Sequence, residues 1–139
     1  MGRAADLGVF DRMTYVITPT GGRPQAFAKL AEYIASQDYK GPFRWIICDD
    51  CDPVSPHPRV SFPVEHVRAP WTWTGENTQA RSMAYLLSLV PDGAAVVIAE
   101  DDDLYKPNHL TTMVEALKTH DLVGQRVSYY ANVKTGRCL

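Results

Sequence analysis

The chain has 139 residues, of which 22% are charged, and its formal net charge is −2 at pH 7. This length fits one domain, spanning residues 1–139, with a real hydrophobic core. The balanced charge argues against a protein that coats nucleic acid. No segment approaches the roughly 20 apolar residues of a membrane span, and the N-terminus lacks the apolar core of a signal peptide. The three cysteines fit a reducing, cytoplasmic setting.

The first half of the chain predicts three strands and one helix. A β-rich run over 13–18 is followed by a segment, 24–37, in which apolar residues recur at helical spacing. A second strand is expected over 43–48. The run 59–67 alternates weakly between polar and apolar residues and predicts a third, shorter strand, in which Pro63 indicates either an edge position or an interruption.

The second half continues the alternation. We expect a helix over 77–90, a buried strand over 94–99, a helix over 107–119 and a final strand over 122–133. The apolar stripe of the first of these helices should consist of Ala80, Met83, Ala84 and Leu87. Strands that alternate with helices imply right-handed crossovers. The predicted fold is therefore α/β, with a single Rossmann-like open sheet, mixed but mainly parallel, flanked by helices.

Four consecutive acids, Glu100-Asp101-Asp102-Asp103, follow the apolar run 94–99. They lie at the carboxyl end of a predicted strand, where open α/β sheets bind ligands. Carboxylates this close repel one another, and a hard divalent cation such as Mg²⁺ or Mn²⁺ would offset that repulsion. The alternative is a solvated acidic turn.

Other polar residues follow the first two strands: Thr20 and Arg23 after one, Asp49 and Asp50 after the next. Parallel strands end at one edge, so these residues and the four acids are expected to meet in one crevice. The glycine patterns of dinucleotide-binding domains, P-loops and serine-hydrolase elbows do not occur in the sequence.

Two further features leave alternatives open. Cys48 and Cys51 have the spacing of a redox or zinc motif, but no second pair completes a zinc site, and packing is the favoured role. Trp71 and Trp73 either stack on a sugar or acceptor ring or pack their loop onto the core.

Taken together, four segments resemble the motifs of family-two glycosyltransferases, in the same order and spacing. The first has Pro19-Thr20 and then Arg23-Pro24, the second ends in Asp49-Asp50, the third contains Ala80-Arg81, and the fourth is the Asp-x-Asp-like acidic run with its trailing Pro107. The resemblance covers most of the chain, from Thr14 to about Leu117. It implies the A-type nucleotide-diphospho-sugar transferase fold.

The resemblance also implies an activity: metal-dependent transfer of a sugar from a nucleotide-diphosphate donor, a UDP-sugar, to an unknown acceptor. It assigns roles to individual residues. Pro19 and Thr20 would lie near the base and Asp50 would accept its N–H; Arg23 and Arg81 would lie near the phosphates, Asp101 would reach the ribose, and Asp102 with Asp103 would hold Mn²⁺ or Mg²⁺. Without the resemblance, Arg81 reads as an exposed helical charge, Asp50 as a turn cap and Arg23 as a solvated residue.

The sequence departs from the family pattern in three ways. Glu100 replaces the first acid of the motif, and Ser82 replaces the usual asparagine. We also expect the C-terminal acceptor-binding half to be missing, and we identify no catalytic base. A nucleotidyltransferase of similar fold and a non-catalytic nucleotide-sugar-binding module therefore remain as alternatives. The final strand could pair across a homodimer.

Overall fold

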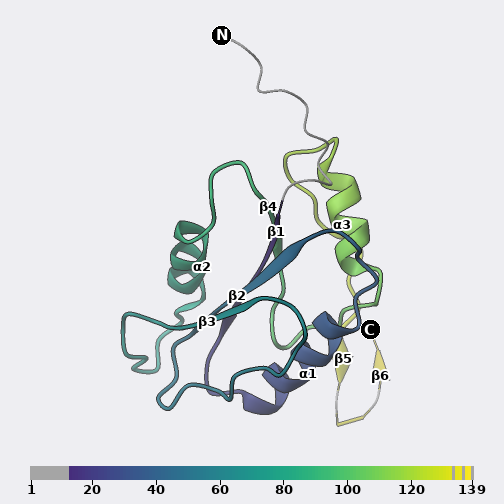
Figure 1. The fold of residues 1–139 in the computed structure, drawn as a ribbon. Coiled ribbons are helices and arrows are strands. Elements are labelled where there is room, and N and C mark those ends of the chain that lie inside the picture. Colours follow the sequence, from purple (N-terminus) through teal and green to yellow (C-terminus); the bar gives the residue numbers. More distant parts are fainter. Residues whose placement is uncertain (1–12, 133, 136, 139) are drawn as a thin grey trace.

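The computed structural model describes residues 13–132, 134–135 and 137–138, and its centre is a parallel sheet (Figure 1). The sheet has four strands in the order β3-β2-β1-β4. Their bounds are β1 Thr14–Thr20, β2 Phe43–Asp49, β3 Val64–Arg68 and β4 Ala95–Ile98. All three pairings are parallel. The predicted α/β fold is confirmed, with a main sheet that is parallel throughout.

The two central strands are buried on both faces, as their apolar runs predict. Val16 of β1 and Trp45 of β2 face one side of the sheet, whereas Ile17 and Ile46 face the other. All four side chains are at most 1% exposed. Each face of the sheet therefore needs its own helical cover.

The helices divide between the two faces (Figure 1). Helices α1, Pro24–Ala35, and α3, His109–Leu117, cover the Val16 face, and α2, Gln79–Ser88, covers the Ile17 face. The residues that pack α1 and α3 onto the sheet are Phe27, Leu30, Ile34, Leu110 and Val114. No described helix is long and apolar enough to cross a bilayer.

The predicted stripe of α2 is shifted from the observed one. Ser82 and Leu86 are the buried residues of this helix, whereas Leu87 is 50% exposed. The small alanines on this helix make the apolar face ambiguous, because Ala80 and Ala84 bury little area in either orientation. The face is chosen by Leu86, which packs against Ile17 and Ile46.

The third strand lies at the edge of the sheet, as predicted, but it is Val64–Arg68 and not 59–67. It begins directly after Pro63, which interrupts the predicted run. The expected final strand over 122–133 is wrong for most of its length. Among the described residues 122–132 only Ala131–Asn132, β5, is a strand, and residue 133 lies outside the described part of the chain. Strand β5 pairs antiparallel with Arg137–Cys138, β6, outside the main sheet. Val and Tyr favour strands only where a surface receives them, and here Val127, Tyr129 and Tyr130 are 62–80% exposed.

A hydroxyl inside the sheet links three strand positions. Thr18 Oγ1 of β1 donates to the carbonyl oxygen of Ala99, just after β4, at 2.7 Å. The same oxygen accepts the indole N–H of Trp45, in β2, at 2.9 Å. Thr18, Ala99 and Trp45 are completely buried, so no water can replace these bonds.

Replacing Thr18 with valine keeps the side-chain shape but removes the hydroxyl from this network. The indole N–H and the carbonyl then lack a partner, so the free energy of unfolding should fall by about 1–3 kcal/mol. Urea denaturation measures the loss. Thr112→Val is the matched control, because Thr112 is exposed on α3, and it should change stability by less than ~0.5 kcal/mol. Equal losses in both variants would contradict this role of Thr18.

Candidate functional site

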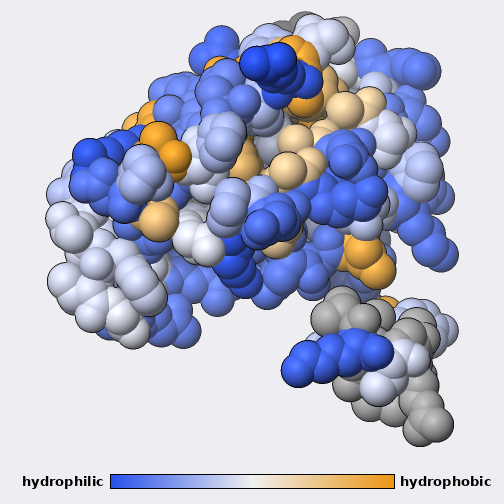
Figure 2. All heavy atoms as spheres, turned by 90° about the horizontal axis from the view of Figure 1, so that it is seen from below, coloured by the Kyte–Doolittle hydropathy of each residue, from blue (hydrophilic) through white to orange (hydrophobic). Residues whose placement is uncertain are grey.

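A cavity of about 930 Å³ lies where the parallel strands end. Its walls come from the ends of β1, β2 and β4, from the residues around the start of α2, and from 128–130. Strand β1 runs down to its junction with α1 at the bottom of Figure 1. Figure 2, seen from below, shows a mainly hydrophilic surface with small separate hydrophobic areas.

Most of the predicted site residues meet in this cavity. The predicted residues that line it are Pro19, Thr20, Arg23, Asp50, Asp102 and Asp103. Asp101 is buried directly behind it, and Arg81 lies outside the lining. Glu100, one of the four acids expected in this crevice, also lines it. The lining residues that we did not predict are Cys51, Glu76, Asn77, Thr78, Gln79, Ser82, Ser128, Tyr129 and Tyr130.

Arg23 holds two of the four consecutive acids. Its Nη2 lies 2.7 Å from Asp101 Oδ1, and its Nη1 lies 3.0 Å from Asp102 Oδ2. Thr20 Oγ1 donates to the other oxygen of Asp101 at 2.7 Å. The Asp101 side chain is fully buried, whereas that of Asp102 is 60% exposed. Asp101 is therefore an anchor between β1 and the acidic turn, whereas Asp102, which pairs with Arg23 through Oδ2, is exposed enough to meet a ligand through Oδ1.

The lining carries an excess of negative charge. Among its described residues are five acids (Asp50, Glu76, Glu100, Asp102 and Asp103) and one basic residue, Arg23. Burial raises the pKa of Glu100, and the charges of Asp103, Asp102 and Asp101 raise it further. Burial also raises the pKa of Asp101, although Thr20 and Arg23 oppose this. A cation would relieve this repulsion.

The acidic residues fit a divalent cation that is shared with a phosphate ligand. Asp102 and Asp103 open onto the cavity and supply the hard oxygen atoms that Mg²⁺ and Mn²⁺ prefer. Within the described ranges, no three His, Cys, Asp or Glu side chains are grouped as a complete metal site. Mg²⁺ is commonly held by one or two carboxylates together with substrate phosphates, and this arrangement matches that pattern.

Asp50 is held at the cavity by two elements. Its backbone N–H donates to the carbonyl of Thr20 at 3.1 Å, and its Oδ2 accepts a short hydrogen bond from the hydroxyl of Thr78, at the start of α2. A Cβ on Gly21 would lie 2.0 Å from Asp50 Oδ1, so any larger residue here would displace the carboxylate from its observed position. The Gly21-Gly22 turn therefore permits the close approach that places Asp50 in the lining.

Asp49 points away from the cavity and is completely buried. It accepts hydrogen bonds from the backbone N–H groups of Cys51, at 3.0 Å, and Ser55, at 2.7 Å. His66 Nε2 lies 3.3 Å from the same carboxylate. Burial alone would raise the pKa of Asp49, but the bonds from His66, Cys51 and Ser55 outweigh it and lower the pKa.

Arg81 and Trp71 contact each other outside the cavity lining, whereas Trp73 lines the cavity. Arg81 lies over the ring of Trp71, 5.4 Å from its centroid, and its Nη1 is 3.8 Å from Glu76 Oε1. Trp71 packs against the core on the α2 face, which favours the packing role for this residue. Trp73 is 52% exposed and lines the cavity. Its contact with a sugar stays a prediction, as does the phosphate role of Arg81.

Cys48 and Cys51, the two cysteines with the spacing of a redox or zinc motif, are free thiols in different settings. Cys48 is buried, and burial raises its pKa to about 11. Cys51 is half-buried in the cavity wall. A thiol with a raised pKa is a poor nucleophile and metal ligand, so packing is the role that fits Cys48.

Comparison with models of protein families and with curated proteins finds no match. Two solved structures of the S. aureus glycosyltransferase TarS are similar in fold. One, of TarS 1-349, has a TM-score of 0.53 at 20% identity and covers 76% of this chain and 31% of that one. The other has a TM-score of 0.55 at 18% identity and covers 78% of this chain and 20% of that one. The chain thus spans less than a third of the TarS chains, and the likeness is one of fold.

The pKa shift of Asp49 predicts a pH dependence of stability. Because the folded-state pKa lies below the ordinary aspartate value of 3.8, Asp49 stabilises the fold above that pH and loses its contribution as pH falls through the folded value. In Asp49→Asn, this part of the acid-induced loss should be absent, and the free energy of unfolding at pH 7 should be about 1–3 kcal/mol lower. Denaturation at a series of pH values measures both.

The control for this prediction is Asp92→Asn, because Asp92 is exposed at a turn. Its curve of stability against pH should parallel that of the original chain. If the curve of Asp49→Asn also runs parallel to it below about pH 4, the contribution of Asp49 is not as described.

Proposed function

We propose that the chain is the donor-binding part of a metal-dependent glycosyltransferase that uses a nucleotide-diphosphate sugar, a UDP-sugar. One observation carries the proposal: Asp50 and Asp102, which the family resemblance assigns to the base and to the metal, line the same cavity. They follow different strands, β2 and β4, and lie on opposite sides of β1 in the sheet order. The resemblance to TarS in fold supports the same class of activity.

The base would lie against the end of β1 and the start of α2. Asp50 would accept the N–H of uracil, and Thr78, whose hydroxyl donates to Asp50, would keep the carboxylate turned toward the cavity. Pro19 and Thr20 form the adjoining wall. An ionised carboxylate only accepts hydrogen bonds, so this position suits a base that donates at the ring nitrogen.

The diphosphate would lie near Arg23 and near the starts of α1 and α2. The residues just before these helices, Arg23 and Thr78, both line the cavity. Helix N-termini carry a partial positive charge and free N–H groups that favour phosphate. Arg81 is 56% exposed and its contact with Glu76 is long, at 3.8 Å, so a change of rotamer can bring a second guanidinium to the phosphates.

Asp102 and Asp103 would hold the cation beside the diphosphate. When bound, Mg²⁺ or Mn²⁺ stabilises the charge that develops on the departing nucleotide diphosphate. Arg23 pairs with Asp101 and Asp102. These contacts would hold its guanidinium beside the phosphate oxygens of the donor. The acceptor and the group that deprotonates it lie outside this proposal.

Binding of UDP measured by calorimetry with and without Mn²⁺ tests the proposal. The chain should bind UDP more tightly with Mn²⁺, and Asp102→Ala should abolish this gain, because only Asp103 of the two proposed metal ligands then remains beside the diphosphate. Asp92→Ala, a change of the same kind at an exposed turn, should keep it. Metal-dependent UDP binding that survives Asp102→Ala would show the metal assignment to be wrong.

Adding a single methyl group at Gly21 tests the base assignment. The Cβ of Gly21→Ala would lie 2.0 Å from Asp50 Oδ1, so the carboxylate must turn away, and UDP affinity should fall about tenfold. Gly124→Ala is the control, because a Cβ there meets no atom within 4 Å. If Gly21→Ala binds UDP as tightly as Gly124→Ala does, Asp50 does not contact the base.

A further inference from the structure

We propose that Asp49 is a positioning residue that fixes the direction of Asp50 and thereby decides which nucleobase the cavity accepts. This inference rests on the proposed function, because it concerns the base of the nucleotide donor. It assigns a role to a buried carboxylate that does not itself line the cavity. The selected ligand is a nucleoside diphosphate whose base donates a hydrogen bond at its ring nitrogen.

The carboxylate of Asp49 ties the following loop at two points. Oδ1 accepts the N–H of Cys51 at 3.0 Å, and Oδ2 accepts the N–H of Ser55 at 2.7 Å. Asp49 itself is the last residue of β2 and is completely buried. Both ends of the 51–55 segment are therefore bound to one group whose position the sheet fixes.

Asp50 stands in the sequence between Asp49 and Cys51, whose N–H is the first of the two that the Asp49 carboxylate binds. Its own N–H donates to Thr20, at the end of β1, and the N–H of the next residue, Cys51, donates to Asp49. With consecutive amides held on both sides, the backbone of Asp50 cannot rotate freely. Its side chain is thus directed toward Thr78 and the cavity.

His66 closes the other side of the Asp49 carboxylate. Its Nε2 lies 3.3 Å from Asp49 Oδ2, and its side chain is only 5% exposed. A carboxylate only accepts hydrogen bonds, so the facing nitrogen of His66 must carry the hydrogen. The bond links β3 to the end of β2 and completes the set of donors around Asp49.

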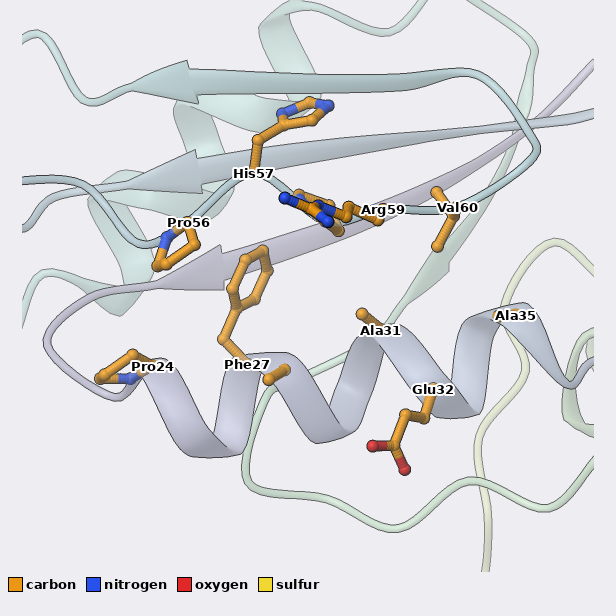
Figure 3. A pocket seen from close by; sticks show the side chains of 11 residues that line it. Pro24, Phe27, Ala31, Glu32, Ala35, Pro56, His57, Arg59 and Val60 are labelled. Atoms are coloured by element: carbon orange, nitrogen blue, oxygen red, sulfur yellow. The ribbon is translucent and has the colours of Figure 1, made fainter.

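The His66–Asp49 contact is shielded from water, because the two side chains are 5% and 0% exposed, and two rings lie against the His66 ring. The ring of Phe27 is 5.5 Å from that of His66, and the ring of His57 stacks on it at 5.7 Å. Figure 3 shows Phe27 rising from α1 and His57 on the facing loop, where both line a second cavity of about 410 Å³. Hydrogen bonds to a charge are stronger in such a dry setting.

Asp52, in the same loop, forms an exposed ion pair and not a set of buried hydrogen bonds like that of Asp49. It pairs with Arg68 at 2.9 Å, and both side chains are more than half exposed, at 66% and 57%. An exposed pair of this kind contributes little. Asp52→Asn is therefore the matched control: the same chemical change, in the same loop, without a buried donor set.

The experiment compares the binding of UDP, CDP and inorganic pyrophosphate by the full chain in Mn²⁺. Cytosine lacks the ring N–H, so the original chain should prefer UDP. In Asp49→Asn the UDP affinity should fall about tenfold and the UDP-to-CDP preference should approach one, while pyrophosphate affinity should stay within about twofold. Asp52→Asn should keep all three affinities. A purely structural loss would weaken all three ligands together, and this result would overturn the proposal.

Two variants at His66 test the same contact if Asp49→Asn does not fold. His66→Gln keeps a donor and should retain more of the base preference than His66→Phe, which keeps the ring volume without the donor. Hydrogen exchange adds a readout that needs no ligand: the Cys51 and Ser55 amides should exchange faster in His66→Phe than in the original chain. Unchanged exchange and an unchanged UDP-to-CDP preference in His66→Phe would overturn the proposal.

The failure of this proposal can be told apart from failure of the proposed function. If the original chain binds neither UDP nor CDP, the function is wrong, and exchange of the two amides still decides whether Asp49 holds the loop. If the chain binds UDP in preference to CDP and Asp49→Asn does so equally well, the function stands and the role of Asp49 is wrong.

Discussion

The site depends on the parallel pairing of β1 with both of its neighbours. Val16 lies opposite Trp45 of β2 and opposite Val97 of β4. In this register the three strands end at one edge of the sheet, and the segments that follow them share one cavity. A slip by one residue would turn every side chain of β1 to the other face. The Thr18 hydroxyl, which bonds toward both neighbours, opposes such a slip.

The charge of the cavity follows from this convergence. The segments after β2 and β4 contribute Asp50, Glu100, Asp102 and Asp103 to the lining. Arg23, after β1, is the only basic residue among the described residues that line the cavity. The side chain of Arg23 is itself half exposed, so the neighbouring charges are only partly offset and the pKa of Glu100 is raised by burial and by those charges. A diphosphate alone would add to the repulsion. A diphosphate together with a divalent cation would not, which is why the proposed ligand and the proposed metal depend on each other.

The sequence was sufficient for the parts of the fold that depend on local pattern. Helical spacing of Phe27, Leu30 and Ile34 predicted α1, and Pro63 predicted the edge position of β3. It was not sufficient where the outcome depends on which surface a segment meets. The Val- and Tyr-rich segment before β5 has strand composition, but its side chains are exposed beside the cavity.

The candidate site could be predicted only in part for a related reason. Parallel topology alone brings Thr20, Asp50 and Asp102 together, and this was foreseeable from strand ends. The contribution of Thr78 depends on where the chain enters α2, and the orientation of Arg81 depends on Trp71 and Glu76. The spacing of residues along the chain predicts neither the Thr78–Asp50 contact nor the orientation of Arg81.

The two pairs of adjacent acids at the site share one arrangement of a buried and an exposed carboxylate. In Asp49-Asp50 and in Asp101-Asp102, the first residue is buried and the second faces the cavity. Asp49 is the last residue of β2, so the alternation of side chains along a strand turns Asp50 to the other side. Asp101 and Asp102 lie in the turn after β4, where Thr20 and Arg23 hold Asp101 inside. The buried member accepts hydrogen bonds from its own surroundings, backbone amides for Asp49 and Thr20 for Asp101. A carboxylate is costly to bury, and these bonds offset that cost. The exposed member accepts a bond through Oδ2, from Thr78 for Asp50 and from Arg23 for Asp102, which leaves Oδ1 to meet a ligand.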